Sequence, residues 1–241
     1  MAALAIRSLK KAFGGLPAIN GVSLEVAPGE RRLIIGPNGA GKTTLFNLIT
    51  GDLRQDQGEV VLFEKGISTL PPHRRAHLGL ARTYQIITLF PNDTLEHNIA
   101  LSLLGLSKKR WNAFSALGKE FSQGDVLERV GLQHLAKRPV SEVAYGDKRR
   151  LEIAMALAQK PRLLLLDEPL AGLSREERAA VKKLIAEIPR EVTVVMIEHD
   201  MDTALDLADR ITVLHYGSVI VEGTRAEVVA DPKTREVYLG H

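Results

Sequence analysis

The sequence predicts an α/β fold that combines a parallel-sheet core with an antiparallel β subdomain and an inserted helical subdomain. Two runs, Leu163–Leu166 and Val192–Ile197, are almost entirely apolar, which is typical of strands covered on both faces of a parallel sheet. A third apolar run, Arg32–Ile35, leads into a glycine-rich segment that is followed by a helical pattern. The stretch from residue 86 to residue 160 is mostly helical in pattern and has no strong strand signal.

The first elements along the chain are predicted to be strands of an edge sheet. Ala3–Ile6 and Val22–Val26 have short or alternating apolar patterns, and the turn signal Ala27–Glu30 separates them from the next strand. After the glycine-rich segment, Thr44–Thr50 has helical spacing and stops at Gly51. This order predicts a strand, a loop and a helix between residues 32 and 50.

Later helices are indicated by their end signals. Asp93-Thr-Leu-Glu96 resembles a capping box, and Ser174-Arg-Glu-Glu177 is another. Pro161 is expected to end the helix that starts near Gly146, because a residue before proline is restricted to extended conformations. We therefore predict a single domain of 241 residues, in which residues 1–85 and 161–241 form the core with its β subdomain and residues 86–160 form the helical subdomain.

Composition excludes several classes of function. The chain has no cysteine, which removes disulfides, thiolate catalysis and cysteine-ligated metal sites. Its net charge is +3 and its basic residues occur as scattered pairs rather than as a stripe, so we expect no nucleic-acid partner. No window approaches the roughly 18 apolar residues of a membrane helix, and the start lacks a signal-peptide pattern, so we expect a soluble, cytoplasmic protein.

The glycine-rich segment matches a phosphate-binding loop, and it lies directly after a predicted strand and before a predicted helix. Glycines let backbone N–H groups turn toward phosphates, and the helix N-terminus adds positive potential. We expect Lys42 to reach the β- and γ-phosphates and the Thr43 hydroxyl to ligate magnesium. The predicted binding residues are Gly36, Pro37, Asn38, Gly39, Ala40, Gly41, Lys42, Thr43 and Thr44.

Two adjacent carboxylates follow one of the buried strands, since Leu163–Leu166 leads directly into Asp167 and Glu168. One carboxylate can hold the magnesium shell while its neighbour takes a proton from an attacking water. We assign Asp167 to the metal shell and Glu168 to the general base. The alternative is that the two acids merely open a surface turn.

The phosphate loop, the block Leu163–Pro169 and the spacing between them resemble the ATP-binding-cassette family over essentially the whole chain. The resemblance implies a P-loop nucleotide-binding core that binds ATP and Mg2+ and hydrolyses ATP. It implies that Gln85 contacts magnesium and water, and that His199, just past a buried strand, senses the γ-phosphate. It also implies that Phe13 stacks on adenine, although an aromatic residue on an edge strand often only packs.

The family's signature motif, usually Leu-Ser-Gly-Gly-Gln, is replaced here by Val143–Asp147. Ala144 lacks the serine hydroxyl that, by resemblance, contacts the γ-phosphate of a partner subunit's nucleotide. Backbone N–H groups near Tyr145 and Gly146 and the helix N-terminus remain for this contact. Asp147 would repel an anion unless its side chain turns away to cap its own helix.

The resemblance also implies a head-to-tail pair with an identical or paralogous ATPase subunit, and transmembrane permease subunits that place the chain on the cytoplasmic face of the inner membrane. Ala171–Ser174 resembles the family's dimer-contact loop, although the capping box explains Ser174 on its own. Ile86–Phe90 is one candidate permease contact. An apolar stripe is another, and core packing explains it equally well: Trp111, Phe114, Leu117 and Phe121.

Within the family, four segments resemble the ATPases of branched-chain amino-acid importers: Phe13–Gly21, Ala81–Ile86, Ala144–Asp147 and Val213–Gly217. Branched-chain or other hydrophobic amino acids or their amides are then the expected cargo. This step is an analogy, because no residue of a motor subunit selects the cargo. The alternative is the ATPase of a lipopolysaccharide exporter, which is similar in length and in the ending Val237–Gly240.

Two alternative functions belong to other classes of protein. A soluble, non-transport relative acting on DNA or ribosomes typically has tandem cassettes or long coiled-coil inserts, and this chain has neither. A small-molecule kinase explains neither Glu168 nor His199 nor the signature-like segment, so transfer of phosphate to an acceptor other than water would be needed to support it.

Overall fold

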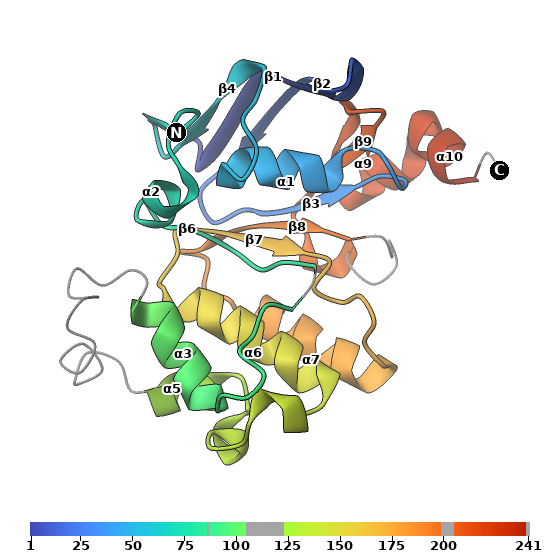
Figure 1. Ribbon diagram of the computed structural model, residues 1–241. Helices are drawn as coiled ribbons and strands as arrows, with labels where there is room; N and C mark the ends of the chain where they lie inside the picture. Colours follow the sequence, from blue (N-terminus) through green and yellow to red (C-terminus); the bar gives the residue numbers. More distant parts are fainter. Residues whose placement is uncertain (86, 105–122, 199–204, 240–241) are drawn as a thin grey trace. The chain divides into compact units, whose positions relative to one another are not determined.

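The computed structural model describes residues 1–85, 87–104, 123–198 and 205–239 (Figure 1). Contacts divide the chain into two compact units. The first contains residues 1–80, 162–168 and 189–241, and the second contains residues 81–161 and 169–188. The domain limits predicted at residues 86 and 160 stay a prediction.

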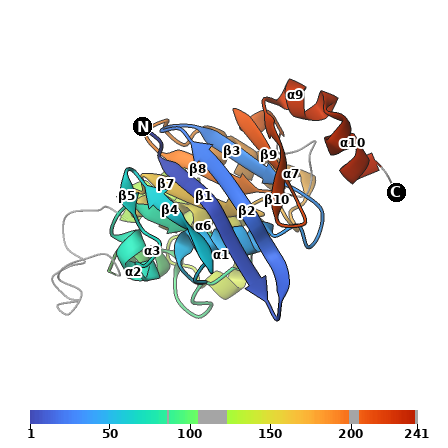
Figure 2. The ribbon, with the colours of Figure 1, turned by 90° about the horizontal axis from the view of Figure 1, so that it is seen from above.

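An antiparallel sheet in the order β2-β1-β4-β5 forms one layer of the first unit (Figure 2). Its strands are β1 (Leu4–Phe13), β2 (Leu16–Val26), β4 (Gln57–Leu62) and β5 (Lys65–Gly66). The predicted edge-sheet strands are confirmed as parts of β1 and β2, which are longer than the sequence indicates. The register shifts between Ile6 and Leu9, where Ser8 has a positive φ of 45°, so the apolar alternation is interrupted inside a continuous strand.

A second sheet has the order β10-β9-β3-β8-β7-β6. Its parallel strands β3 (Arg31–Ile35), β7 (Leu163–Asp167) and β8 (Thr193–Ile197) are buried at every position, as predicted from their apolar runs. The other strands of this sheet have no predicted counterpart. They are the antiparallel pair β9 (Arg210–His215) and β10 (Ser218–Gly223) and the short β6 (Leu80–Arg82), where the chain passes into the second unit.

Helix α1 (Lys42–Thr50) lies between the antiparallel sheet and β3 (Figure 1). Leu45, Phe46, Leu48 and Ile49 are fully buried in one cluster with side chains from both sheets, so burial of apolar surface fixes this helix and the loop before it. The remaining helical segments among the described residues of this unit are α2 (Pro72–Ala76), η3 (Leu205–Leu207), α9 (Arg225–Ala230) and α10 (Pro232–Leu239).

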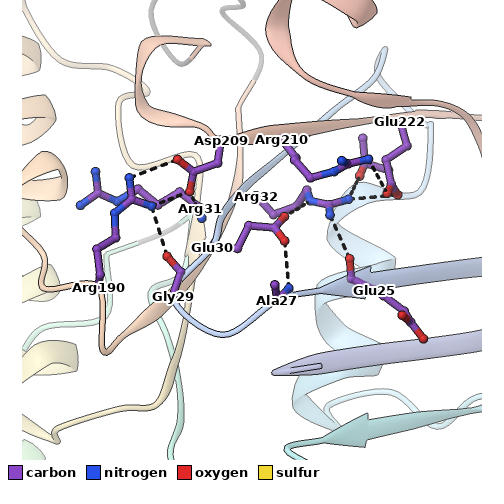
Figure 3. Close-up of polar contacts among 11 residues, drawn as sticks. Glu25, Ala27, Gly29, Glu30, Arg31, Arg32, Arg190, Asp209, Arg210 and Glu222 are labelled. Atoms are coloured by element: carbon purple, nitrogen blue, oxygen red, sulfur yellow. Dashed lines mark hydrogen bonds and ion pairs between the residues drawn. The ribbon is translucent and has the colours of Figure 1, made fainter. Parts of the chain in front are cut away.

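Arg32 is a buried cation that joins four strands of the first unit (Figure 3). Its Nε donates to Glu30 Oε1 at 2.6 Å, and its Nη1 lies 3.0 Å from Glu222 Oε2 on β10. The guanidinium also donates to Thr212 Oγ1 on β9 and to the Glu25 carbonyl on β2, each at 2.9 Å. The side chain therefore links the antiparallel sheet to the second sheet through charge-assisted hydrogen bonds.

We expect Arg32→Ala to lower the free energy of unfolding by about 3–5 kcal/mol, because it leaves the carboxylate of Glu30, whose side chain is 10% exposed, without its cation. Chemical denaturation measures the loss. Arg7→Ala is the matched control: Arg7 and Glu59 form an ion pair at 2.7 Å with both side chains at least half exposed, and such pairs contribute about 0–1 kcal/mol. Equal effects of the two substitutions would contradict the structural role of Arg32.

The second unit is mainly helical where the structure describes it. Its helices there are α3 (Leu95–Leu104), α5 (Gln123–Arg129), η1 (Gln133–Leu135), η2 (Val140–Glu142), α6 (Tyr145–Ala158) and α7 (Arg175–Ala186). Helix α6 contacts α3, α5 and α7, so it is the central helix of this unit. Among the helices that the structure describes in either unit, none is long and apolar enough to cross a membrane.

The two predicted capping boxes have different outcomes. The box at Ser174 is confirmed, since Ser174 and Glu177 bond each other's backbone N–H groups at the start of α7. The box at Asp93 is wrong by one position, because α3 begins at Leu95 and the Thr94 hydroxyl accepts the His97 N–H at 3.2 Å. Asp93 instead pairs with the His97 side chain at 3.0 Å.

Candidate functional site

The loop between β3 and α1 needs glycine at two positions because the backbone of other strands lies against it. A Cβ on Gly36 would overlap the Leu214 carbonyl oxygen of β9. Gly41 is the N-cap of α1 with φ 101°, and a Cβ there would lie 2.5 Å from the Ala18 carbonyl oxygen. Strand β3 and these contacts therefore hold the predicted phosphate loop in a conformation that only glycine permits.

Lys42 is fixed across this loop. Its Nζ donates to the carbonyl oxygens of Gly36 at 2.7 Å and Pro37 at 3.1 Å, and the side chain is 6% exposed. Burial lowers the pKa of Lys42, and the charges of Glu168 and Asp167 oppose this shift. The ammonium is thus placed at the start of α1 by its own loop, with two carboxylates near enough to affect its charge.

Buried Arg75 anchors the opposite end of α1. Its Nη1 donates to the carbonyl oxygens of Leu48 and Ile49 at 2.7 and 2.8 Å, and its Nε donates to the Leu70 carbonyl at 2.8 Å. Burial lowers the pKa of Arg75, and Asp52 opposes this shift. The last carbonyls of the helix that carries the phosphate loop are therefore satisfied by a cation.

Asp167 and Glu168 lie at the carboxyl end of β7, as predicted, and both are buried, at 1% and 5% exposed. Glu168 has φ 48°, a left-handed conformation that costs energy for a residue other than glycine. Its N–H donates to the Ile197 carbonyl at 3.0 Å, so neighbouring β8 holds the strained residue in place. Strain of this kind is concentrated at functional sites.

The residues of the first unit fit a magnesium nucleotide. Helix α1 has no side-chain cap and no acid in its first turn, so its N-terminus suits an anion. Thr43, Asn38 and Gly39 are exposed. Hydroxyl and carboxylate oxygens from Thr43 and Asp167 are ligands that Mg2+ prefers.

Two further residues of this unit bear on the site. Phe13 lies at the end of β1 with 47% of its surface exposed, so part of its ring is accessible for stacking. Lys11 Nζ lies over the ring, 5.6 Å from its centroid. Glu198, directly after β8, is a third buried acid of this unit, 3% exposed, and it is not among the predicted site residues. Its place directly before His199 in the sequence could have identified it as a candidate site residue.

In the second unit, the backbone around Gln85 is held by α6. Buried Arg149 donates to the carbonyl oxygens of Tyr84 at 3.0 Å and Gln85 at 3.2 Å, and it pairs with Glu152 at 2.7 Å. Glu152 in turn accepts the Tyr84 N–H at 3.1 Å. The Gln85 side chain is exposed, so this clamp fixes the backbone while leaving the amide accessible.

The signature segment, residues 143–147, forms the start of α6. Ala144 is the N-cap and supplies no side-chain cap, and Tyr145 is 44% exposed. The Gly146 N–H donates to Glu177 Oε1 at 2.9 Å, so a group expected to face a nucleotide is engaged inside the chain. Asp147 does turn away, but it pairs with Arg150 rather than capping its own helix.

The structure therefore brings together the phosphate loop, Asp167 and Glu168 in the first unit, and it presents Gln85 and the signature segment in the second. Several predicted residues lie outside the described part of the chain: His199, Ile86, Trp111, Phe114, Leu117 and Phe121.

Known proteins resemble this chain over nearly its whole length. A family model described as ABC transporter matches residues 19–171. The chain is 39% identical to the high-affinity branched-chain amino acid transport ATP-binding protein LivG of Salmonella typhimurium and also 39% identical to BraF of Pseudomonas aeruginosa, with 98% of this chain and 97% of each relative covered. The crystal structure of the ADP conformation of MJ1267, an ATP-binding cassette of an ABC transporter, matches with a TM-score of 0.87 and 32% identity over all of both chains.

Proposed function

Because this chain belongs to the ABC transporter family of ATP-hydrolysing subunits, we propose that it powers the import of branched-chain or other hydrophobic amino acids, or their amides. The cargo rests on one observation, the 39% identity over 98% of the chain to LivG, whose name gives branched-chain amino acid transport. The ATPase chemistry, with ATP and Mg2+, follows from the family itself.

In the proposed mechanism, residues of the first unit bind the nucleotide and start hydrolysis. The N–H groups at the start of α1 and the Lys42 ammonium bind the phosphates, and the Phe13 ring stacks on adenine. Thr43 and Asp167 would hold Mg2+, and the bound ion would supply positive charge beside the phosphates. Glu168 accepts a proton from the attacking water, and its strained, anchored backbone aims the carboxylate.

Residues outside this set complete the reaction. Gln85 orients the water and would contact Mg2+, His199 senses the γ-phosphate, and the signature segment of a second subunit covers the nucleotide. That second subunit is identical or paralogous and pairs head to tail with this chain. Transmembrane permease subunits bind the two paired ATPase subunits at the cytoplasmic face of the inner membrane. ATP-driven pairing of the ATPase subunits then moves the permease subunits.

Uptake of labelled amino acids tests the cargo. Deleting this chain is expected to abolish energy-dependent uptake of leucine, isoleucine and valine while leaving lysine uptake unchanged, because the motor powers one transporter. The wild-type chain should restore uptake, and the Glu168→Gln variant should not. Unchanged leucine, isoleucine and valine uptake in the deletion strain, or full restoration by Glu168→Gln, would contradict the proposal.

A further inference from the structure

Glu177, at the third position of α7, binds the starts of two helices. Its Oε1 accepts a hydrogen bond from the Gly146 N–H of α6, and its Oε2 accepts one from the Ser174 N–H, each at 2.9 Å. The Glu177 N–H donates to Ser174 Oγ at 3.3 Å. One carboxylate thus joins the signature segment to the loop 171–174, although Gly146 and Glu177 are 31 residues apart in sequence.

The surroundings of Glu177 are adapted to this bridge. Hydrogen bonds from Ser174 and Gly146 lower the pKa of Glu177, so the carboxylate is ionised at neutral pH, where a negative charge suits both helix N-termini. A Cβ on Gly146 would lie 2.6 Å from Glu177 Cγ and Oε1, so glycine leaves the room that the carboxylate occupies. A Cβ on Gly172 would meet the Tyr145 ring at 3.4 Å, which places the same two segments together at a second point.

We propose that Glu177 is a positioning residue that sets the orientation of the signature segment by fixing it to the loop 171–174. This inference rests on the proposed function, in which the signature segment completes the nucleotide site of a paired subunit. The segment has no serine hydroxyl at Ala144 to direct at a phosphate, so the orientation of its backbone decides the contact. The Gly146 N–H, which the family resemblance assigns to that contact, instead holds the segment in place.

Hydrogen exchange on the purified chain tests the bridge directly. Glu177→Ala is expected to speed exchange of the Gly146 N–H at least about tenfold, since it removes a hydrogen bond to a charged group. Two control variants distinguish the loss of this hydrogen bond from the loss of a negative charge and from the loss of the α7 cap. Glu176→Ala removes the same charge from the same exposed turn, and Ser174→Ala removes the hydroxyl cap of α7, so Gly146 exchange should change less than about twofold in both. Unchanged exchange in Glu177→Ala, or an equal increase in Glu176→Ala, would overturn the bridge.

Steady-state kinetics of the assembled transporter test the positioning role. Glu177→Ala should lower kcat roughly tenfold with KM for ATP within about twofold, because the phosphate loop is untouched while the partner's site is misaligned. Glu176→Ala should keep the wild-type kcat. A normal kcat in Glu177→Ala, or an equal loss in Glu176→Ala, would overturn the role. A wild-type complex without ATPase activity would instead contradict the proposed function, and the exchange experiment would still decide whether the bridge exists.

Discussion

Replacing Glu168 by glutamine is expected to lower ATP turnover by roughly 10²–10⁴-fold while ATP binding stays intact, the usual scale for a positioned general base. Glutamine keeps the size of the side chain and the backbone bond to Ile197, but it cannot accept the proton of the attacking water. Phosphate release under saturating ATP measures turnover, and titration with a fluorescent ATP analogue measures binding.

Glu64→Gln is the matched control for this substitution. Glu64 also has a left-handed backbone, with φ 67°, and it lies in the exposed turn between β4 and β5. Its replacement should leave turnover unchanged, which separates the loss of the Glu168 carboxylate from a general effect of substituting a strained glutamate. Near-normal turnover in Glu168→Gln would remove Glu168 from the role of general base.

Replacing Gly36 by alanine is expected to weaken ATP binding about a hundredfold, because even a small displacement of a positioned group is costly. The new Cβ would overlap the Leu214 carbonyl oxygen, which belongs to a buried strand, so the loop must move instead. Overpacking of this kind also costs about 1–3 kcal/mol of stability. The same nucleotide titration measures the affinity, and denaturation measures the stability.

Gly66→Ala provides the comparison, since no atom lies within 4 Å of a Cβ built at Gly66 and its backbone has no positive φ. That variant should bind ATP like the wild type. A Gly36→Ala protein with wild-type affinity would show that the contact between the loop and β9 does not shape the phosphate site.

The phosphate loop and the Asp167–Glu168 pair could be predicted from the sequence because each is a local signal. A glycine-rich segment between a strand and a helix can be recognised within a few residues of sequence, and so can two acids that follow an apolar run. The strands β3, β7 and β8 were found for the same reason, since burial on both faces leaves continuous apolar runs. Their assignment did not depend on distant parts of the chain.

Other features depend on contacts between distant residues and were missed. The bridge from Glu177 to Gly146 is invisible in a sequence in which Glu177 already has an adequate local explanation as part of a capping box. The clamp of Arg149 on the Gln85 backbone joins residues 64 positions apart. Burial of the cation Arg32 could not be read from a strand that otherwise looked apolar, because its partners lie on three other strands.

As an ABC ATPase this chain binds ATP, and we propose that two subunits pair through the bound nucleotide. The most direct test is the solution mass of the Glu168→Gln protein with and without ATP and Mg2+, with bound nucleotide measured in the same sample. We expect the mass to double on adding ATP, with one ATP then bound to each chain. A protein that keeps its monomer mass and binds no ATP would contradict it.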